Sequence, residues 1–478
     1  MANIRVDVLT EQEISDIHEA SLAILGDAGV LVHHEDVLKL LGQAGAKIDA
    51  DRRIARLSEQ LVTASVARAG KAYTLYGRDA QQVARFGQGD FILMSSPGQY
   101  AWIDRQTGTR RPATIQDALD AIRLGDALEN ISIVGAMAQP EEVSERHRDV
   151  FLTGELVKGT GKPTRCWVRN GATARYILEI YRAAAGGEDA LRARPMIAAF
   201  LEPISPLQLP RDGLDIVREF AQAGQPVSIG PMAMVSATGP GTLAGTLAQE
   251  NAEILAGVVV AQLLAPGTPI CYGGIPHIMD PRTGICSFGS PEQGLMAVAM
   301  VQMGRFYGFP VYVNTGLTDA KTLDAQAGAE KGMTMLLGAL AGADMFGHAG
   351  ICGTDHAASL EWLAADSEVM AYTRRIARGF DVTGETLATD VVKAVGPAGS
   401  FLTEEHTVRH FRSEMWMPNA TWTRQSWDGW HGAGQTTMAG RLQDEVNCLL
   451  TEHTPEPIDE KLAAEIDSIV DAARCELG

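Results

Sequence analysis

The feature that most constrains the fold is a repeated alternation of short apolar runs with longer amphipathic stretches. Beyond about residue 113, seven short apolar runs are each followed by a stretch whose apolar positions have helical spacing. In most of these units a proline lies just before the run, and polar or glycine residues come just after it. This pattern is typical of parallel βα repeats, in which each strand is buried on both faces. The predicted strands cover residues 131–139, 163–170, 195–207, 226–234, 269–276, 310–316 and 344–350.

The number of units favours an α/β fold of the closed (β/α)8 TIM-type over an open doubly wound sheet. An eighth, less regular strand is expected near Ser359–Leu363, before the helical stretch EVMAYTRRIARG. The first βα turn lacks the GxGxxG pattern of dinucleotide-binding folds, which weakens the open-sheet alternative further. We therefore expect a catalytic barrel over residues 113–390.

The segments on either side of the barrel predict extensions. Residues 1–112 predict a helical cap, up to about residue 75, followed by a small β-hairpin within FILMSSPGQYAWIDRQTGTRRPAT. Residues 391–478 predict a helical tail that contains Trp416, Trp422, Trp427 and Trp430. Because aromatic residues are favoured in interface cores, one interpretation is a homo-oligomer, and the alternative is packing of these rings on the chain's own barrel.

The composition excludes several classes of partner. The formal net charge is -19 at pH 7, which repels nucleic acid and anionic membrane surfaces, so we expect neither as a partner. The first residues lack the apolar core of a signal peptide, and the densest apolar run, residues 254–265, is too short to span a bilayer. A cytoplasmic location is therefore expected. The six cysteines occur singly, without the paired spacing of a zinc site, so no bound metal is predicted.

Aromatic and polar residues gather where the predicted strands end, which is where ligands bind in a barrel. Several aromatic faces beside one or two acids suit a methylated ammonium ligand, because each cation–π contact contributes about 0.5–2 kcal/mol. The alternative is that Trp167, Phe200 and Tyr272 only fill the barrel core. The strand-end candidates are Trp167, Phe200, Glu202, Tyr272, Asn314, Phe346 and His348.

The polar loop TGLTDAKTLDAQAG follows the sixth predicted strand and should also face the ligand. A plainer alternative places Asp324 in the first turn of the next helix and pairs Asp319 with Lys321 at the surface. The sequence contains no GxSxG, HExxH or P-loop pattern and no paired Cys–His motif. Hydrolysis by a serine nucleophile, zinc proteolysis and nucleotide use therefore have no support.

Three segments in this order and spacing, TLAGTLAQENAEILAGVVVAQLLAPGTPICYG, DPRTGICSFGSPEQ and TDAKTLDAQAGAE, resemble the trimethylamine methyltransferase superfamily over nearly the whole chain. RRPAT at residues 110–114 and SPL at residues 205–207 fit the same pattern. The resemblance implies a TIM-type barrel that transfers a methyl group from a methylated amine to the cobalt of a partner corrinoid protein. In the trimethylamine enzymes, pyrrolysine occupies the position of Thr322. The chain therefore resembles the non-pyrrolysine branch, which acts on quaternary amines such as glycine betaine, proline betaine or carnitine-type compounds.

This departure at Thr322 has a chemical explanation. A quaternary ammonium already carries its charge, so attack by cob(I)alamin on the methyl carbon expels a neutral amine without an acid or a covalent adduct. The protein then has to position the methyl group and exclude water. The expected roles are an acceptor-facing loop of Asp319, Lys321, Thr322 and Gln326, an ammonium pocket of Trp167, Phe200, Tyr272 and Phe346 with Glu202 as counter-charge, and carboxylate binding by Asn314 and His348. Tyr100 is a candidate to close the pocket, with packing inside the hairpin as the alternative.

The expected function is removal of a methyl group from a quaternary amine, glycine betaine first, and its transfer to cob(I)alamin on a corrinoid protein. The sequence has no DxHxxG cobalamin-binding pattern, so any cobalamin arrives on another protein or from solution. One alternative keeps the substrate class but uses tetrahydrofolate as the methyl acceptor. Another is a protein that binds betaines tightly without turning them over.

Overall fold

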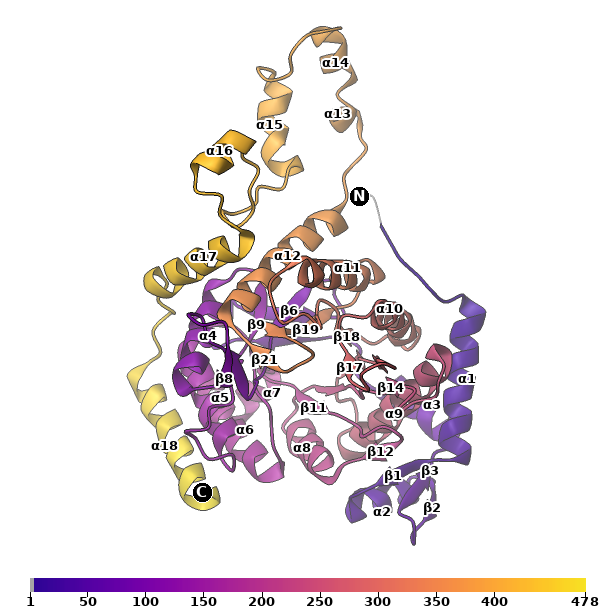
Figure 1. Cartoon of the computed structure of the whole chain (residues 1–478). Helices are drawn as coiled ribbons and strands as arrows, with labels where there is room; N and C mark the ends of the chain where they lie inside the picture. The colour runs from indigo at the N-terminus through magenta and orange to yellow at the C-terminus, as the bar shows by residue number, and fades with distance from the viewer. Residues whose placement is uncertain (1–3) are drawn as a thin grey trace.

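At the centre of the structure, a computed structural model that describes residues 4–478, an eight-stranded parallel sheet curls into a barrel (Figure 1). The strands follow the order β10-β9-β6-β19-β18-β15-β13-β11, so those adjacent along the chain are adjacent in the barrel. At the seam between the two end strands, Nη1 of Arg165 donates to the carbonyl oxygen of Ala198 at 2.7 Å. The predicted (β/α)8 TIM-type barrel is confirmed. Its strands are β6 (Ile92–Ser95), β9 (Ile131–Gly135), β10 (Thr164–Arg165), β11 (Ala199–Leu201), β13 (Val227–Ile229), β15 (Ile270–Gly274), β18 (Val311–Val313) and β19 (Met345–Ala349).

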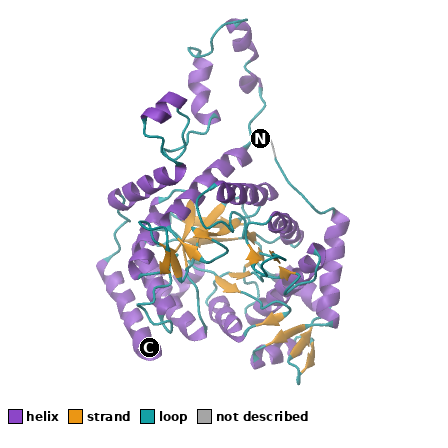
Figure 2. Ribbon diagram, viewed as in Figure 1, coloured by secondary structure: helices purple, strands orange, loops and turns teal. Residues whose placement is uncertain are grey.

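A helix follows every barrel strand, and together the helices surround the sheet (Figure 2). Several begin at a capping side chain, such as Asn170, Ser290 or Asp324, whose oxygen accepts from backbone N–H groups of the first turn. These helices are α4 (Ile115–Ala127), α5 (Arg148–Gly159), α6 (Gly171–Ala185) with the short α7 (Glu188–Ala193), α8 (Arg211–Gln222), α9 (Leu243–Leu264), α10 (Pro291–Phe306), α11 (Ala325–Ala341) and α12 (Leu360–Arg378).

Helix α9 is long and apolar enough to cross a membrane by length and composition alone. In the fold, 89% of its most apolar window is buried. It lies between α1 (Glu11–Asp27) and α3 (Glu59–Arg68) on one side and the barrel sheet on the other. Its apolar surface is therefore explained by burial on all sides, as in the core helix of a large protein.

The eighth barrel strand is not where the sequence predicted it. Ser359 caps α12 by accepting from the backbone N–H of Trp362 at 3.3 Å, so the segment Ser359–Leu363 begins a helix and the predicted strand there is wrong. The eighth strand is β6, which pairs with β9 and β19. All four of its residues are buried, but a short apolar run does not reveal its partners. The barrel sheet consequently begins before residue 113, where the sequence placed its boundary.

The N-terminal segment is less uniformly helical than expected. Helices α1, α2 (Glu35–Gln43) and α3 are present, but short strands separate them. Strands of three residues show no periodicity that a sequence can reveal. These strands join one from the barrel loops in a sheet of order β12-β1-β3-β2, with β1 (Val30–Val32), β2 (Lys47–Asp49), β3 (Ile54–Arg56) and β12 (Gln208–Leu209).

The hairpin of β4 (Tyr73–Tyr76) and β5 (Val83–Phe86) plugs the N-terminal end of the barrel. The rings of Tyr73 and Phe86 stack at 4.4 Å between centroids. They share an apolar cluster with Ile92 and Met345, the first residues of two barrel strands. This packing leaves the C-terminal end of the barrel for ligand access.

Loops and small sheets build the rim at the C-terminal end. The predicted hairpin is present as β7 and β8, although it is shorter than expected because FILMS belongs to the barrel. The rim strands are β7 (Ala101–Ile103), β8 (Arg110–Pro112), β14 (Met234–Val235), β16 (His277–Met279), β17 (Cys286–Ser287), β20 (Ile351–Cys352) and β21 (Ala357–Ala358).

After α12 the chain leaves the barrel, forms a projecting segment and returns (Figure 1). The projection contains α13 (Gly384–Leu387), α14 (Thr389–Val395), α15 (Glu405–Glu414) and α16 (Trp427–Gly432). On the return, α17 (Met438–Glu452) packs against α12 and α4, and α18 (Glu460–Leu477) packs against α5 and α6.

Candidate functional site

Two neighbouring hollows open at the C-terminal end of the barrel and share Trp167 and Arg169 in their walls. One has a volume of about 300 Å³ and is lined by Gln99, Tyr100 and Asp355 among others. The other has a volume of about 190 Å³ and contains Arg165, Phe200 and Glu202 in its lining. A larger hollow of about 540 Å³ lies at the opposite end, beside Pro310 and Asp344 where two strands begin. We place the site at the C-terminal end because chemistry in this fold is found there.

The aromatic walls come from three strands. Trp167 is half-buried just after β10, and its indole Nε1 donates to the carbonyl oxygen of Gly98 at 3.1 Å, which fixes the ring. Phe200 on β11 lies 6.1 Å from Tyr312 on β18 in an edge-to-face arrangement inside the barrel. A Cβ atom at Gly347 would overlap the Tyr312 ring, so glycine at that position leaves room for the aromatic pair. Both rings line the smaller hollow, and their predicted role in an ammonium pocket stays a prediction.

Two carboxylates add negative charge to the rim. Glu202 and Asp355 line the hollows and are partly exposed. The surrounding protein nevertheless desolvates both carboxylates in part. This desolvation raises the pKa of Asp355 to about 6, although the amide of Gln99 donates to its carboxylate and works in the opposite direction. Desolvation first, and the charge of Asp355 second, raise the pKa of Glu202. An organic cation bound here would therefore meet two acids.

Arg165 brings a positive charge into the same space. Its guanidinium carbon lies 5.3 Å from the centroid of the Phe200 ring, and Nη1 is held by the carbonyl of Ala198. Across residues 4–478, no carboxylate oxygen lies within 4.0 Å of this guanidinium. Burial lowers the pKa of Arg165, but an arginine remains a cation in a protein. The barrel mouth thus holds a cation that has no acidic partner within the described part of the chain.

His348 and Asn314 occupy different settings. His348 has a φ of 62° where the register of β19 shifts, and its ring centroid lies 5.9 Å from that of Trp167. Burial, and then the charge of Arg165, lower the pKa of His348 to about 4, so the ring is neutral near pH 7. Asn314 is buried, and its side-chain oxygen accepts from the hydroxyl of Tyr312. Within residues 4–478 the neutral His348 ring has no hydrogen-bond partner, whereas the Asn314 oxygen already accepts a hydrogen bond.

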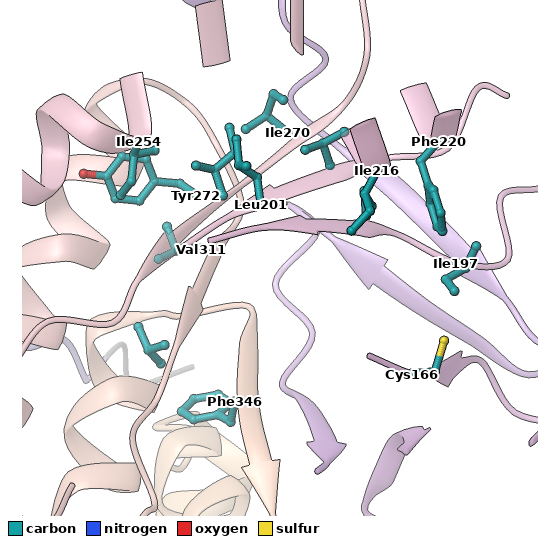
Figure 3. Close-up of a cluster of buried hydrophobic side chains, with 14 of the residues drawn as sticks. Cys166, Ile197, Leu201, Ile216, Phe220, Ile254, Ile270, Tyr272, Val311 and Phe346 are labelled. Atoms are coloured by element: carbon teal, nitrogen blue, oxygen red, sulfur yellow. The ribbon is translucent and has the colours of Figure 1, made fainter. Parts of the chain in front are cut away.

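The expected placement of Tyr272 and Phe346 in the ammonium pocket is wrong. Both lie in the apolar shell between the sheet and its helices, together with residues such as Ile254 (Figure 3). The hydroxyl of Tyr272 donates to Asn251 on α9 at 2.8 Å, and the Phe346 ring lies 6.2 Å from that of Phe91. Successive residues of a strand face opposite sides, and both sides of these strands are apolar, so the sequence pattern does not reveal which residue faces inward.

Asp319 connects the loop after β18 to two other rim loops. Its carboxylate accepts from the backbone N–H of Phe288 at 2.7 Å, from the hydroxyl of Thr354 at 2.8 Å and from the hydroxyl of Ser287. Nζ of Lys321 donates to the backbone carbonyl of Asp319 at 2.6 Å, so the surface ion pair considered as an alternative does not form. The geometry makes Asp319 a positioning residue for this loop.

The polar residues that follow Asp319 in the loop face solvent. Thr322 donates to the carboxylate of Asp324 at 2.8 Å, and the amide of Gln326 donates to Glu330 at 2.8 Å. The alternative placed Asp324 in the first turn of the next helix. The structure places it one position earlier, as the N-cap of α11, where its carboxylate also favours the helix. Lys321, Thr322 and Gln326 are all exposed. Their predicted role opposite a methyl acceptor stays a prediction.

Tyr100 is 59% exposed, so it does not fill the hairpin core. It lines the 300 Å³ hollow at the C-terminal end of the barrel. The guanidinium of Arg148 lies 5.8 Å from its ring centroid. Sequence reasoning missed Arg165 and Asp355. For Arg165 a signal existed, since a charged residue inside a strand expected to be buried on both faces needs a reason. Asp355 comes from an irregular loop, where no pattern marks it.

Among residues 4–478, no group of three or more His, Cys, Asp or Glu side chains is arranged to hold a metal ion. All six cysteines are free, and Cys166, Cys271 and Cys352 are buried. Burial raises the pKa of the Cys166 and Cys271 thiols to about 12, so neither is a thiolate near pH 7.

Comparison with known proteins relates the whole chain to one family. A family model described as trimethylamine methyltransferase (MTTB) matches residues 2–478. A trimethylamine methyltransferase MttB from Desulfitobacterium hafniense (strain DSM 10664 / DCB-2) is 31% identical over 98% of this chain and 94% of its own. A glycine betaine methyltransferase from Desulfitobacterium hafniense (strain Y51) is 31% identical over 99% of this chain and 98% of its own. Among solved structures, the Methanosarcina barkeri monomethylamine methyltransferase (MtmB) covers 97% of this chain and is itself 91% covered, at 12% identity and a TM-score of 0.49.

Proposed function

The chain belongs to the trimethylamine methyltransferase family and is a methyltransferase, and we propose that its methyl donor is a quaternary amine that also carries a carboxylate. Glycine betaine is the first candidate within this class. The observation that carries the proposal is Arg165, the cation at the barrel mouth for which the described residues offer no acidic partner.

A betaine is a zwitterion, and the smaller hollow is complementary to both of its ends. Phe200 and Trp167 offer aromatic faces and Glu202 offers a negative charge to the ammonium group. Arg165 can form a charge-assisted, bidentate hydrogen-bond pair with the carboxylate. A buried cation is costly when unpaired, so a ligand that brings an anion gains more than one that does not. Trimethylamine and choline lack that anion.

This assignment revises the expected carboxylate ligands. Arg165 takes the leading role, with His348 as a neutral N–H donor beside it. Asn314 is a weaker candidate because its side-chain oxygen already accepts from Tyr312. Tyr100 is exposed beside the 300 Å³ hollow, and we propose that it covers the bound amine.

The loop after β18 supports a donor that needs no activation. Thr322 is an exposed hydroxyl that donates to Asp324, and that carboxylate caps helix α11. In methyl transfer from a quaternary amine, the electron pair of the C–N bond stays on nitrogen and a neutral tertiary amine leaves. No proton has to be supplied to the leaving group. The chain then has only to hold the methyl carbon toward its acceptor and to exclude water.

For the methyl acceptor, we propose cob(I)alamin carried by a corrinoid protein, which acts here as a second substrate. Support comes from the family and from the exposed loop residues Lys321, Thr322 and Gln326, which offer a polar surface at the rim for a docking protein. Tetrahydrofolate is the alternative acceptor, and capture of a betaine without turnover is the alternative function. A cytoplasmic location and a homo-oligomeric state complete the proposal.

The test begins with titration calorimetry of glycine betaine, proline betaine, carnitine, choline and trimethylamine. We expect the three carboxylates to bind and the other two to bind at least about tenfold more weakly, a difference of about 1.4 kcal/mol. An absorbance assay for methylcobalamin from cob(I)alamin then follows with each ligand that binds. Binding without methylation of cobalamin would favour tetrahydrofolate as the methyl acceptor or betaine binding without turnover. Preferential binding of trimethylamine would contradict the proposed methyl donor.

The Arg165→Met variant tests the residue itself. We expect it to lose about 10- to 100-fold in affinity for glycine betaine and little for choline, because only the betaine has a carboxylate to lose its partner. The matched control is Arg175→Met, since Arg175 lies exposed on α6 and pairs with Glu219 at 3.1 Å, away from the barrel mouth. Equal losses for glycine betaine and choline in Arg165→Met would show that Arg165 only supports the fold.

A further inference from the structure

The long buried helix α9 carries two carboxylates that have no cationic partner in the described part of the chain. Glu250 and Glu253 are at most 1% exposed, and across residues 4–478 no lysine, arginine or histidine nitrogen lies within 4.0 Å of either. Burial raises the pKa of both carboxyl groups. A buried acid that is not paired with a cation has to be stabilised by hydrogen bonds. The donors of each carboxylate therefore show what that carboxylate holds in place.

The donors to Glu253 come chiefly from the loop between β11 and α8. Oε1 accepts from the backbone N–H of Leu207 at 2.8 Å, and Oε2 accepts from the hydroxyl of Ser205 at 2.7 Å. The amide of Gln249, one helical turn earlier on α9, donates to Oε1 at 2.9 Å and fixes the carboxylate. Glu253 thus holds two positions of one short loop.

These two positions belong to the tip of a tight turn. Ile204 and Gln208 exchange backbone hydrogen bonds of 2.9 and 3.1 Å across this turn. At its tip, Leu207 has a φ of 58°, a left-handed conformation that is unfavourable for a residue other than glycine. The hydrogen bond from the Leu207 N–H to Glu253 offsets that strain and keeps the turn in this shape.

Glu202 lies directly before the turn, in the wall of the smaller hollow. Glu202 and Pro203 alone separate Leu201, the last residue of β11, from Ile204, where the turn begins. Proline fixes its own φ and restricts the backbone of the residue before it, so this link has little freedom. Beyond the turn, Pro210 lines the same hollow. The position of the Glu202 carboxylate is therefore set by the sheet on one side and by the turn on the other.

On the basis of the proposed function, in which Glu202 is the counter-charge for the ammonium group, we propose that Glu253 is a positioning residue for substrate binding. It holds the turn that places Glu202. Glu253 does not itself line the hollow, so its effect on binding passes through the loop. Loss of its acceptors leaves the Leu207 N–H without a partner and lets the strained turn relax, and Glu202 moves with the turn.

Glu250 provides a matched control on the same helix. It is fully buried and accepts from the backbone N–H groups of Ala233 and Ile275, each at 3.0 Å. These two residues follow β13 and β15, and neither lines a hollow at the C-terminal end of the barrel. A variant at Glu250 therefore removes the same kind of contact from loops that do not carry Glu202.

The test is a double-mutant cycle in which titration calorimetry measures the Kd of glycine betaine and of choline. We expect Glu202→Gln and Glu253→Leu each to weaken both ligands about 3- to 10-fold, because both ligands have an ammonium group that loses its counter-charge. In the Glu202→Gln background, Glu253→Leu should change Kd by less than about twofold. Glu250→Leu should lower the melting temperature as Glu253→Leu does, but it should leave Kd within about twofold of the natural value.

Two conservative variants separate the position of Glu253 from its charge. Glu253→Gln keeps the length of the side chain: its oxygen can accept from Leu207, and the hydroxyl of Ser205 can turn to accept from the new amide. It should keep Kd within about twofold of the natural value. Glu253→Asp keeps the charge but is one methylene shorter, so it should weaken binding about 2- to 5-fold. This variant carries the test if Glu253→Leu does not fold.

Natural affinity in Glu253→Leu, or the same loss with and without the Glu202 carboxylate, would overturn the inference. So would a loss in Glu253→Gln together with natural affinity in Glu253→Asp, because the charge and not the position would then matter. If Glu202→Gln weakens binding but Glu253→Leu does not, only the inference fails. If Glu202→Gln binds both amines like the natural chain, the counter-charge in the proposed function is wrong and the inference fails with it.

Discussion

At the scale of single residues, the site combines two acids, aromatic faces and one cation that has no acidic partner in the described part of the chain. Arg165 comes from β10, Glu202 follows β11 and Asp355 comes from the loop between β20 and β21. Their ionisation depends on the surrounding protein more than on the residue type. The pKa of Asp355 rises to about 6, while that of His348 falls to about 4, and burial is the first cause of both shifts.

The raised pKa of Asp355 predicts a pH-dependent affinity for the amine. Above pH 6 the carboxylate is charged and attracts the ammonium group, and as the pH falls through 6 it becomes protonated and that attraction is lost. We expect the affinity for glycine betaine to fall about 3- to 10-fold between pH 7 and pH 5. His348, with a pKa near 4, stays neutral over this range.

Calorimetry at several pH values measures this dependence. The matched variant is Asp355→Asn, which keeps the shape of the side chain but has no charge to titrate. It should bind more weakly at pH 7 and show a flatter profile down to pH 5. A natural protein whose affinity is the same at pH 7 and pH 5 would exclude Asp355 from the ammonium site.

Substitution of an aromatic residue in the hollow and of one in the outer shell should affect ligand binding differently. Trp167→Leu removes a ring from the hollow and should weaken binding of quaternary amines by about 0.5–2 kcal/mol, or about 2- to 30-fold in Kd. Tyr272→Phe removes only the hydroxyl that donates to Asn251 on the outer side of the barrel. It should leave Kd unchanged and lower stability by about 1 kcal/mol. A large change of Kd in Tyr272→Phe would show that Tyr272 contributes to the ligand pocket after all.

At the scale of elements, the rim loops are held in place from behind by a buried ion pair between α11 and α12. Nζ of Lys331 lies 2.8 Å from the carboxylate of Asp366, and both side chains are almost fully buried. Lys331 also donates to the backbone carbonyls of Gly316, after β18, and of Ile351, on β20, while Asp366 accepts from Gly350. Desolvation raises the pKa of Asp366, which shows how costly its charge would be without the lysine.

Loss of one partner from this pair should therefore destabilise the fold more than loss of both. Lys331→Met leaves a buried carboxylate without its counter-charge, and we expect a cost of about 3–5 kcal/mol. In Lys331→Met/Asp366→Leu both charges are removed, so the loss should be smaller. Thermal and urea unfolding of both variants measure the difference. If the double variant is the less stable of the two, the ion pair is not the feature that holds these loops.

At the scale of the whole molecule, the structure separates a barrel with one open end from a projecting segment, residues 380–437. The barrel buries its helices on its sheet and keeps one end open, while the β4–β5 hairpin closes the other. The segment of residues 380–437 places ten exposed apolar residues away from that opening.

The sequence predicted most of the fold because its evidence was local and repeated. Seven barrel strands are confirmed, each predicted from an apolar run between turn residues. The eighth was placed wrongly, since FILMS is equally compatible with a hairpin strand and with β6. Only its pairing with β9 and β19 distinguishes the two.

The candidate site was predictable to a smaller extent. The strand-end rule placed Trp167, Phe200 and Glu202 at one face of the barrel, and all three line a hollow there. The same rule placed Tyr272 and Phe346 in the pocket, but both lie in the apolar shell outside the barrel. In a strand with two apolar faces, the sequence does not reveal which residue points inward.

By itself, then, the sequence determined the barrel, and it predicted the end at which the site lies and the kind of ligand that aromatic and acidic residues suit. Those properties follow from residue type and spacing along the chain. Only the tertiary structure decided that Arg165 has no acidic partner within residues 4–478, that Asp355 joins the rim and that the apolar residues of the segment 380–437 are exposed. These depend on contacts between residues far apart in the sequence, which no local pattern encodes.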